Sequence, residues 1–422
     1  MTARDKKAWT HLRLALSSTF AEGAARILAF AFFAVLARFA GPGLFGEVRA
    51  ALSASQIAAG LGVPFLTSVS RLGGGASPAH TSKDPGPAQL SPELTGWFLF
   101  TLLGALAAGF GYGFYNRSGA AVFLCTVGFG CNYFGMLVAR SYQLPRALMF
   151  VTLLGNAGQL AVLLMLMLWV PRAVTADAIV VVYACAFILP VAISRSLRRF
   201  TTVRLTTLAT LAQDLWTRRP EYLSQLAQHI SHVLVVGLDL LVLSLVVPSK
   251  IVGEYAAIKG LLLVILLPAT ALFHMVIPAS VRRLDGQRTA GDLPLLWIGS
   301  SAVVAAAATT AVFGEWLMRT IYGTRYLGLG LAVAYGALGA GLYGLSLLRG
   351  ATWIARGRTG AFSVIVSTAA ILEAAALVAF PALATPLGAA SAWTAANAAV
   401  AAVMVLAEWV NHTGKRSAGN AA

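Results

Sequence analysis

The chain has 422 residues, of which 58% are hydrophobic and only 11% are charged. A soluble domain of this size does not have such a composition, which excludes a water-soluble enzyme or binding module. The formal net charge of +16 is compatible with nucleic acid binding, but the basic residues stand at the ends of apolar runs, where they set membrane topology instead.

Apolar runs of about 20 residues, each long enough to cross a bilayer, recur from one end of the chain to the other. The basic N-terminus leads into the first run without a small-residue cleavage site, which predicts a retained first helix. The sequence therefore predicts an all-α polytopic membrane protein with about twelve transmembrane helices, over 12–39, 46–70, 94–115, 119–140, 147–170, 176–193, 222–247, 252–279, 293–320, 326–355, 361–380 and 386–410.

Loops rich in Lys and Arg alternate with loops that hold few of them. The positive-inside rule places the rich loops in the cytoplasm, and an even number of spans puts both termini there. The basic stretch 195–220 lies at the middle of the chain and is interpreted as a surface-lying, partly helical linker, with a solvated basic loop as the alternative. We predict an N-terminal six-helix lobe over 1–200, a cytoplasmic linker over 201–220 and a C-terminal six-helix lobe over 221–422.

Two pairs of stretches indicate an internal repeat. Pro42–Leu52 is similar to Pro248–Ile258, and Ser68–Leu72 is similar to Ser280–Leu284. Six spans in each copy give both copies the same orientation, and parallel repeats of this kind place a substrate site at their interface. Chance similarity between apolar helices is the alternative.

Four stretches, 26–46, 237–259, 321–326 and 385–393, resemble the multidrug/oligosaccharidyl-lipid/polysaccharide (MOP) exporter superfamily, and within it the polysaccharide transporter or O-antigen-type flippase branch. The resemblance implies two lobes around a V-shaped cavity that opens to either side of a bacterial cytoplasmic membrane. It also implies a substrate built on undecaprenyl pyrophosphate. Two features depart from the family: lipid II flippases usually have fourteen spans, and the motif after Gly46 continues with Glu47-Val48 where a Tyr is usual.

The helix over 222–247 carries polar groups on one face, because Gln225, His229, His232, Val236 and Asp239 are spaced 4, 3, 4 and 3 residues apart. Ionisable groups at membrane depth are functional candidates. His229 and His232 are candidates for a proton relay, and the alternative is a hydrogen bond to a neighbouring helix.

Lys259 lies on the next helix, about as far from the turn at Lys250 as Asp239 does. Either the two form a structural salt bridge, or they form a gating pair that opens and closes as protons, Na⁺ or substrate bind. The sequence assigns Asp239 and the two histidines to coupling and gating, and Lys259 to the cavity.

In the first span, Glu22 and Arg26 share a face, with Arg26 near mid-membrane. A guanidinium in a wet cavity suits a pyrophosphate, because its fork matches the phosphate oxygens. The alternative is an intrahelical Glu22–Arg26 pair. Arg49 and Gln56 form a similar stripe on the second span and complete the predicted cavity site, although Arg49 lies where it could snorkel to the interface. Weaker candidates for the cavity or for helix contacts are Asn132, Asn156, Gln159, His274, Arg349, Glu373 and Asn397.

The sequence contains no phosphate-binding loop, zinc motif or nucleophile elbow, so we expect no enzyme activity, no cofactor and no metal site. It predicts a flippase or exporter of a lipid-linked oligosaccharide, with H⁺ or Na⁺ and membrane lipids as further partners. Glycan polymerases or glycosyltransferases are expected to act beside it. The alternatives are a cation-coupled multidrug exporter and a non-transporting scaffold, while short outer loops disfavour a membrane glycosyltransferase.

Overall fold

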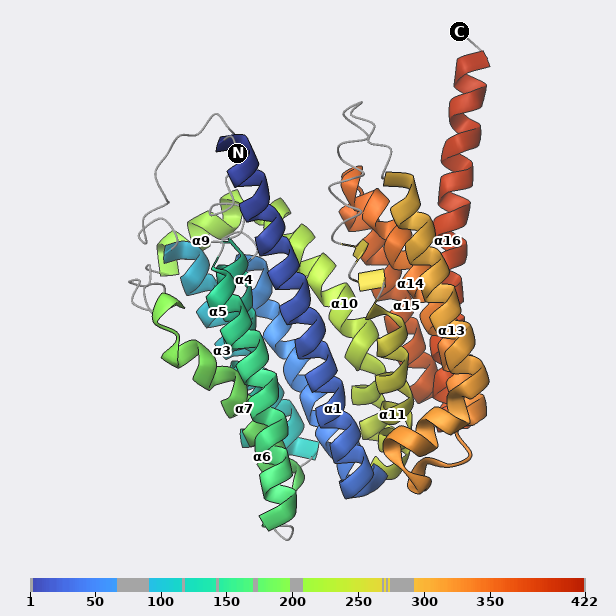
Figure 1. Cartoon of the computed structure of the whole chain (residues 1–422). Coiled ribbons are helices and arrows are strands. Elements are labelled where there is room, and N and C mark those ends of the chain that lie inside the picture. Colours follow the sequence, from blue (N-terminus) through green and yellow to red (C-terminus); the bar gives the residue numbers. More distant parts are fainter. Residues whose placement is uncertain are drawn as a thin grey trace. The chain divides into compact units, whose positions relative to one another are not determined.

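A computed structural model describes residues 3–66, 91–115, 118–141, 144–169, 174–197, 208–267, 269–270, 272–273 and 292–420. Side chains are described from residue 23 onward, except those of residues 91, 115, 140, 141, 145, 208, 292–296 and 411–420. The described residues form helices and the turns between them, with no strand (Figure 1). This confirms the predicted all-α class, which is the architecture that a bilayer imposes, since a helix satisfies its backbone hydrogen bonds internally.

The helices of the N-terminal half run from α1 to α10. They are α1 (Ala3–Ala59), α3 (Ser91–Tyr115), α4 (Gly119–Ser141), α5 (Pro145–Met149), α6 (Gly155–Trp169), α7 (Ala176–Ile193), α9 (Leu208–Thr217) and α10 (Arg219–Val246). A π-helical turn over Phe150–Leu154 joins α5 to α6, and a 3₁₀ turn over Gly60–Gly62 follows α1.

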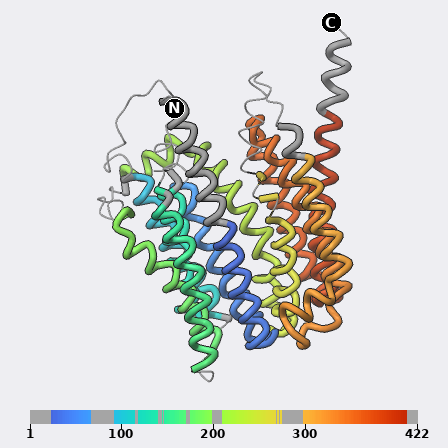
Figure 2. The backbone as a smooth tube through the Cα atoms, in the orientation of Figure 1, coloured from blue at the N-terminus to red at the C-terminus, as the bar shows by residue number. Residues whose placement is uncertain are grey.

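Helices of the C-terminal half are α11 (Ser249–Ile265), α13 (Asp292–Tyr322), α14 (Gly330–Ala355), α15 (Thr359–Ala379) and α16 (Pro386–Asn420). Figure 2 follows the same path as a tube through the Cα atoms. Helix α14 lies at the centre of this half, because it packs against α11, α13, α15 and α16. Its row of small residues, many of them Gly and Ala, allows such close packing.

Ten described helical segments are long and apolar enough to cross a membrane. One of them, Gly23–Leu66, has 44 residues and contains both of the first two expected spans, which meet at Gly41 with φ 79° and ψ 174°. Helix α11, with 17 residues, begins the expected span 252–279, which extends beyond the described residues. Counting the two arms of α1 separately and including α11 accounts for the expected twelve.

The chain divides into two compact units. The first comprises Met1–Ala40 and Glu47–Val233, and the second comprises Gly41–Gly46 and Leu234–Ala422. The change of unit therefore falls inside α10, and the turn of α1 belongs to the second unit. The predicted boundaries at 200 and 220 stay a prediction.

The predicted linker contains one described helix, α9. Leu211 of α9 is buried against Phe65 and Tyr222 in a small apolar cluster of the first unit. The linker is thus partly helical, as expected, and this helix is anchored to the first unit. Residues 198–207 of the linker lie outside the described residues.

The two copies of the repeat touch each other through their glycines within the second unit. A Cβ atom at Gly46 would lie 2.0 Å from the carbonyl oxygen of Ser249, and a Cβ at Gly253 would lie 1.8 Å from the carbonyl oxygen of Pro42. Pro42 and Ser249 are the same number of residues apart as Gly46 and Gly253, so Pro42 in the first copy corresponds to Ser249 in the second. In both contacts the glycine of one copy therefore meets the equivalent carbonyl oxygen of the other copy. This reciprocity is that of a two-fold interface, and it supports a true repeat over chance similarity.

We expect Gly253→Ala to lower the thermal stability of the purified chain. The added methyl group must displace backbone atoms, and overpacking of this kind costs about 1–3 kcal/mol. Gly43→Ala is the matched control, because a Cβ there would meet only Ser249 Oγ at 3.9 Å. Equal unfolding midpoints for the two variants in a fluorescence melt would contradict the close approach.

Candidate functional site

The first unit exposes the arginine that the sequence places in the cavity. Arg26 is exposed on α1, in the apolar segment Gly23–Leu66. The place of Arg26 in a substrate cavity stays a prediction. The side chain of Glu22 lies outside the described residues, so the intrahelical pair stays a prediction.

Arg49 and Gln56 are half-buried inside the first unit beside aromatic rings. The guanidinium carbon of Arg49 lies 4.4 Å from the ring centroid of Phe33. Gln56 hydrogen-bonds with Tyr133. Between these contacts runs a series of neighbouring rings, here called the aromatic row, which consists of Phe33, Tyr183, Phe129 and Tyr133. Two of the predicted cavity residues therefore lie at the two ends of one row.

The histidines of α10 belong to the same unit. His229 packs edge-on against Tyr133, with 5.3 Å between ring centroids, and its Nε2 atom is buried without a hydrogen-bond partner among the described residues. His232 is exposed on the same helix. Because Asp239 belongs to the second unit, the polar stripe of α10 is divided between the units. A relay along the whole stripe stays a prediction.

The second unit contains a buried ion pair between Asp239 of α10 and Lys259 of α11. The Lys259 Nζ atom lies 2.5 Å from an Asp239 carboxylate oxygen, and the two side chains are 0% and 2% exposed. Lys259 also donates a hydrogen bond to the carbonyl oxygen of Val235 at 2.8 Å. Tyr255 donates its hydroxyl proton to Asp239 Oδ2 at 2.6 Å. The ammonium also lies 4.8 Å from the ring centroid of Trp393 on α16. Each of the two charges therefore has further partners in the protein besides the other charge.

A third charged group, Glu373 of α15, joins this pair. Its side chain is buried, and its Oε1 atom has no hydrogen-bond partner among the described residues. It lies within electrostatic range of both Asp239 and Lys259. The charged cluster is defined here as Asp239, Lys259, Tyr255 and Glu373.

The geometry of Asp239 and Lys259 fits the salt-bridge interpretation, and the gating role and the cavity role of Lys259 stay predictions. Sequence reasoning gave Glu373 only as a weaker candidate, because nothing in the sequence brings α15 beside α10. Tyr255 and Trp393 were missed as partners of the pair. Both stand in stretches that carry the family resemblance, which is the signal that could have found them.

We expect Lys259→Met to destabilise the chain by about 3–5 kcal/mol, because it leaves the Asp239 carboxylate buried without its cation. The double variant Asp239→Leu/Lys259→Met removes both charges and is expected to lose less than the single variant does. The measurement is a double-mutant cycle on thermal or denaturant unfolding. Additive losses would show that the two side chains do not depend on each other.

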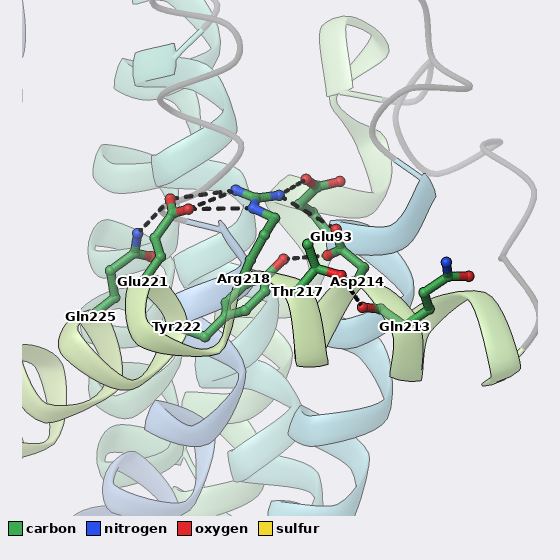
Figure 3. A network of polar contacts seen from close by, with 8 residues as sticks. All are labelled: Glu93, Gln213, Asp214, Thr217, Arg218, Glu221, Tyr222 and Gln225. Carbon is green, nitrogen blue, oxygen red and sulfur yellow. Dashed lines mark hydrogen bonds and ion pairs between the residues drawn. The ribbon is translucent and has the colours of Figure 1, made fainter.

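A second network joins the linker helix α9 to α3 and α10 within the first unit (Figure 3). Arg218, in the turn between α9 and α10, forms ion pairs with Glu93 of α3 at 2.8 Å and with Glu221 at 3.3 Å. Tyr222 donates a hydrogen bond to Asp214 at 2.7 Å. Burial lowers the pKa of Arg218, but its hydrogen bonds to Glu221 and Glu93 outweigh this and raise the pKa above its ordinary value. The guanidinium therefore stays positively charged and keeps its ion pairs with Glu93 and Glu221.

We expect Arg218→Met to release α9 from the first unit, since buried Glu93 then loses the partner of one oxygen, at a cost of about 1–3 kcal/mol. Arg219→Met is the matched control, because Arg219 is exposed and stacks on Trp216 at 4.5 Å. Limited trypsin digestion should cleave the 195–220 stretch several-fold faster in Arg218→Met than in the control. The same rate in both would mean that Arg218 does not hold the linker.

No protein-family model matches the sequence, and no curated protein matches it either. Several solved structures, however, are similar to this chain in fold. The lipid II flippase MurJ in an inward closed conformation aligns with a TM-score of 0.67 at 12% identity over 92% of this chain and 87% of MurJ. A multidrug resistance MATE family transporter of the MOP superfamily, in an inward-facing conformation, aligns with a TM-score of 0.66 at 14% identity over 96% of this chain and 98% of that one.

An outward-facing MATE structure aligns less closely, with a TM-score of 0.57 at 14% identity over 97% of this chain and 96% of that one. At these identities the likeness establishes the fold and leaves the branch open. The chain is a multi-pass membrane protein with the two-lobe fold that is shared by the lipid II flippase MurJ and the MATE transporters of the MOP superfamily.

Proposed function

We propose that this protein is a flippase or exporter that moves a lipid-linked oligosaccharide or polysaccharide precursor across a membrane by alternating access. The observation that carries the proposal is the exposure of Arg26 in an apolar transmembrane segment. Such a charge is tolerated where it meets water, and a water-filled groove is what a polar head group needs for its passage.

Arg26 is proposed to hold the pyrophosphate, because a guanidinium offers two parallel hydrogen bonds to phosphate oxygens. Arg49 and Gln56 are proposed to act on the same substrate from the ends of the aromatic row, where the half-buried rings of Phe33 and Tyr133 are proposed to meet its sugars. Lys259 is assigned to the charged cluster instead, because its ammonium is already bound to Asp239. The chain changes the position of its substrate and breaks no bond in it.

Voltage supplies one driving force for such a step. With the inside negative, each negative charge that moves outward gains about 2.3 kcal/mol per 100 mV. We propose a bacterial cytoplasmic membrane with both termini in the cytoplasm, as the distribution of basic loops indicates. Glycosyltransferases on the inner side would then supply the substrate, and a glycan polymerase on the outer side would consume it.

A cation-coupled multidrug exporter is the second candidate, favoured by the shared fold with MATE transporters. Cationic drugs call for an acidic site, and the buried carboxylate of Asp239 already has a lysine as its partner. The arginines of the first unit favour an anionic substrate instead. A non-transporting scaffold would make no use of an exposed Arg26.

The test uses the full-length chain in liposomes with a fluorescent polyprenyl-pyrophosphate-linked sugar. We expect Arg26→Ala to lower the flipping rate at least tenfold, which is about 1.4 kcal/mol, and Arg26→Lys to retain part of it, because an ammonium keeps the charge but loses the fork. Arg38→Ala, an exposed arginine farther along the same helix, is the control. Wild-type flipping by Arg26→Ala at equal reconstitution would overturn the proposed role, and export of a cationic dye alone would favour the second candidate.

A further inference from the structure

The end of the first unit where α9 meets α10 carries an exposed tryptophan beside an exposed arginine. Trp216 of α9 is 72% exposed, and the guanidinium carbon of Arg219 lies 4.5 Å from the centroid of its ring. Within the described part of the chain, this ring is the only partner of the Arg219 side chain. The N–H donors of the guanidinium therefore have no acceptor among the described residues.

This pair lies where two membrane-crossing segments begin. The apolar segments of α10 and α3 begin at Arg219 and at Pro92. Arg218 bonds to Glu93, in the first turn of α3, at 2.8 Å and so holds the two starts together (Figure 3). Leu223 follows Arg219 by four residues and therefore shares its face of α10, and it is 62% exposed. An exposed leucine in such a segment suits the apolar chains of lipid.

The carboxylates around the pair are engaged on the other side of the turn. They are bonded to Tyr222 in one case and to Arg218 in the other two, and they are Asp214, Glu93 and Glu221. Successive residues of a helical turn point about 100° apart. Arg218 accordingly is half-buried against the protein, while its neighbour Arg219 is exposed. The two arginines therefore have different partners, and that of Arg219 lies outside the described residues.

The stretch 195–220 as a whole is strongly basic. It contains six arginines and a single acidic residue, Asp214, which gives a formal charge of +5. The distribution of basic loops places this stretch on the cytoplasmic side, where the surface of the membrane is negative. A basic cluster next to a membrane-crossing segment is typical of binding to anionic lipid head groups. The charge therefore favours an anionic partner that lies in the membrane.

We propose that Trp216 and Arg219 form a binding site for the head group of an anionic phospholipid. The phosphodiester accepts hydrogen bonds from the guanidinium, whose fork matches phosphate oxygens. The indole ring lies at the level of the head groups, because its body is apolar and its N–H is polar. Leu223, about one helical turn deeper, meets the beginning of the acyl chains. This site is separate from the proposed transport and does not depend on it.

An acidic cytoplasmic protein is the competing occupant, and the apolar neighbour favours lipid over it. Such a protein would cover Arg219 but would not reach Leu223, which lies within a membrane-crossing segment. A phospholipid offers the anion and the apolar chains in one molecule. The site is also held in place before the lipid arrives, because Leu211 of α9 is buried in the first unit and Arg218 is bonded to Glu93. Preorganisation of this kind lowers the cost of binding.

The test measures lipid binding to the full-length chain in detergent. Native mass spectrometry follows the first bound phosphatidylglycerol during a titration, with phosphatidylcholine, which has no net charge, as the reference lipid. We expect the wild type to prefer phosphatidylglycerol and Arg219→Gln to weaken that binding about fivefold, which is about 1 kcal/mol. Trp216→Leu should also weaken it several-fold, while Trp216→Phe should retain most of it, because phenylalanine keeps a ring face for the guanidinium.

Arg358→Gln is the matched control, because Arg358 is exposed in the turn between α14 and α15 and has no aromatic partner among the described residues. Without added phospholipid, all variants should unfold at the wild-type temperature, since the altered side chains are exposed. An equal loss in Arg358→Gln would reduce the effect to diffuse surface charge and overturn the site. Equal binding of the two lipids by the wild type would also overturn it. Wild-type lipid binding by both Arg219→Gln and Trp216→Leu would do the same and would favour an acidic protein.

Discussion

The cost of placing charge at membrane depth is the constraint on which the rest of the structure depends. A charged side chain there either reaches water or is surrounded by partners. The second unit meets this constraint by enclosing Asp239 and Lys259 together, while Arg26 lies on the surface of the first unit. Because the pair supplies its own counter-charge, it needs no water, and the second unit can bury it beside Tyr255 and Trp393.

The repeat gives a second constraint, which is close backbone approach. Gly46 and Gly253 each bring a helix against a carbonyl oxygen of the other copy at a distance that any side chain would prevent. The turn at Gly41–Gly46 groups with the second unit, although the helical stretches on either side of it belong to the first. Both glycine contacts therefore lie within the second unit, which contains the turn of the first copy and the start of α11 from the second copy.

Much of the fold could be predicted from the sequence, because apolar runs and basic loops report directly on the bilayer. The meeting of Asp239 with Lys259 was also predictable, since both lie about equally far from one turn. Two features were not. One is that the two helical arms of α1 are separated by a single non-helical residue, Gly41. The other is the electrostatic contact of Glu373 with the pair, which depends on how α15 packs and which no local pattern encodes.

The difference between the units also explains why one chain contains both kinds of charged site. A substrate anion has to be held and then released, so its cationic partner must lie in water, where an ion pair contributes little and exchanges readily. An ion pair that joins two helices has to stay formed, so it is buried, where the loss of either partner leaves an uncompensated charge. The Asp239–Lys259 pair meets this second requirement, and the exposure of Arg26 is what the proposed function asks of a residue that binds an anion.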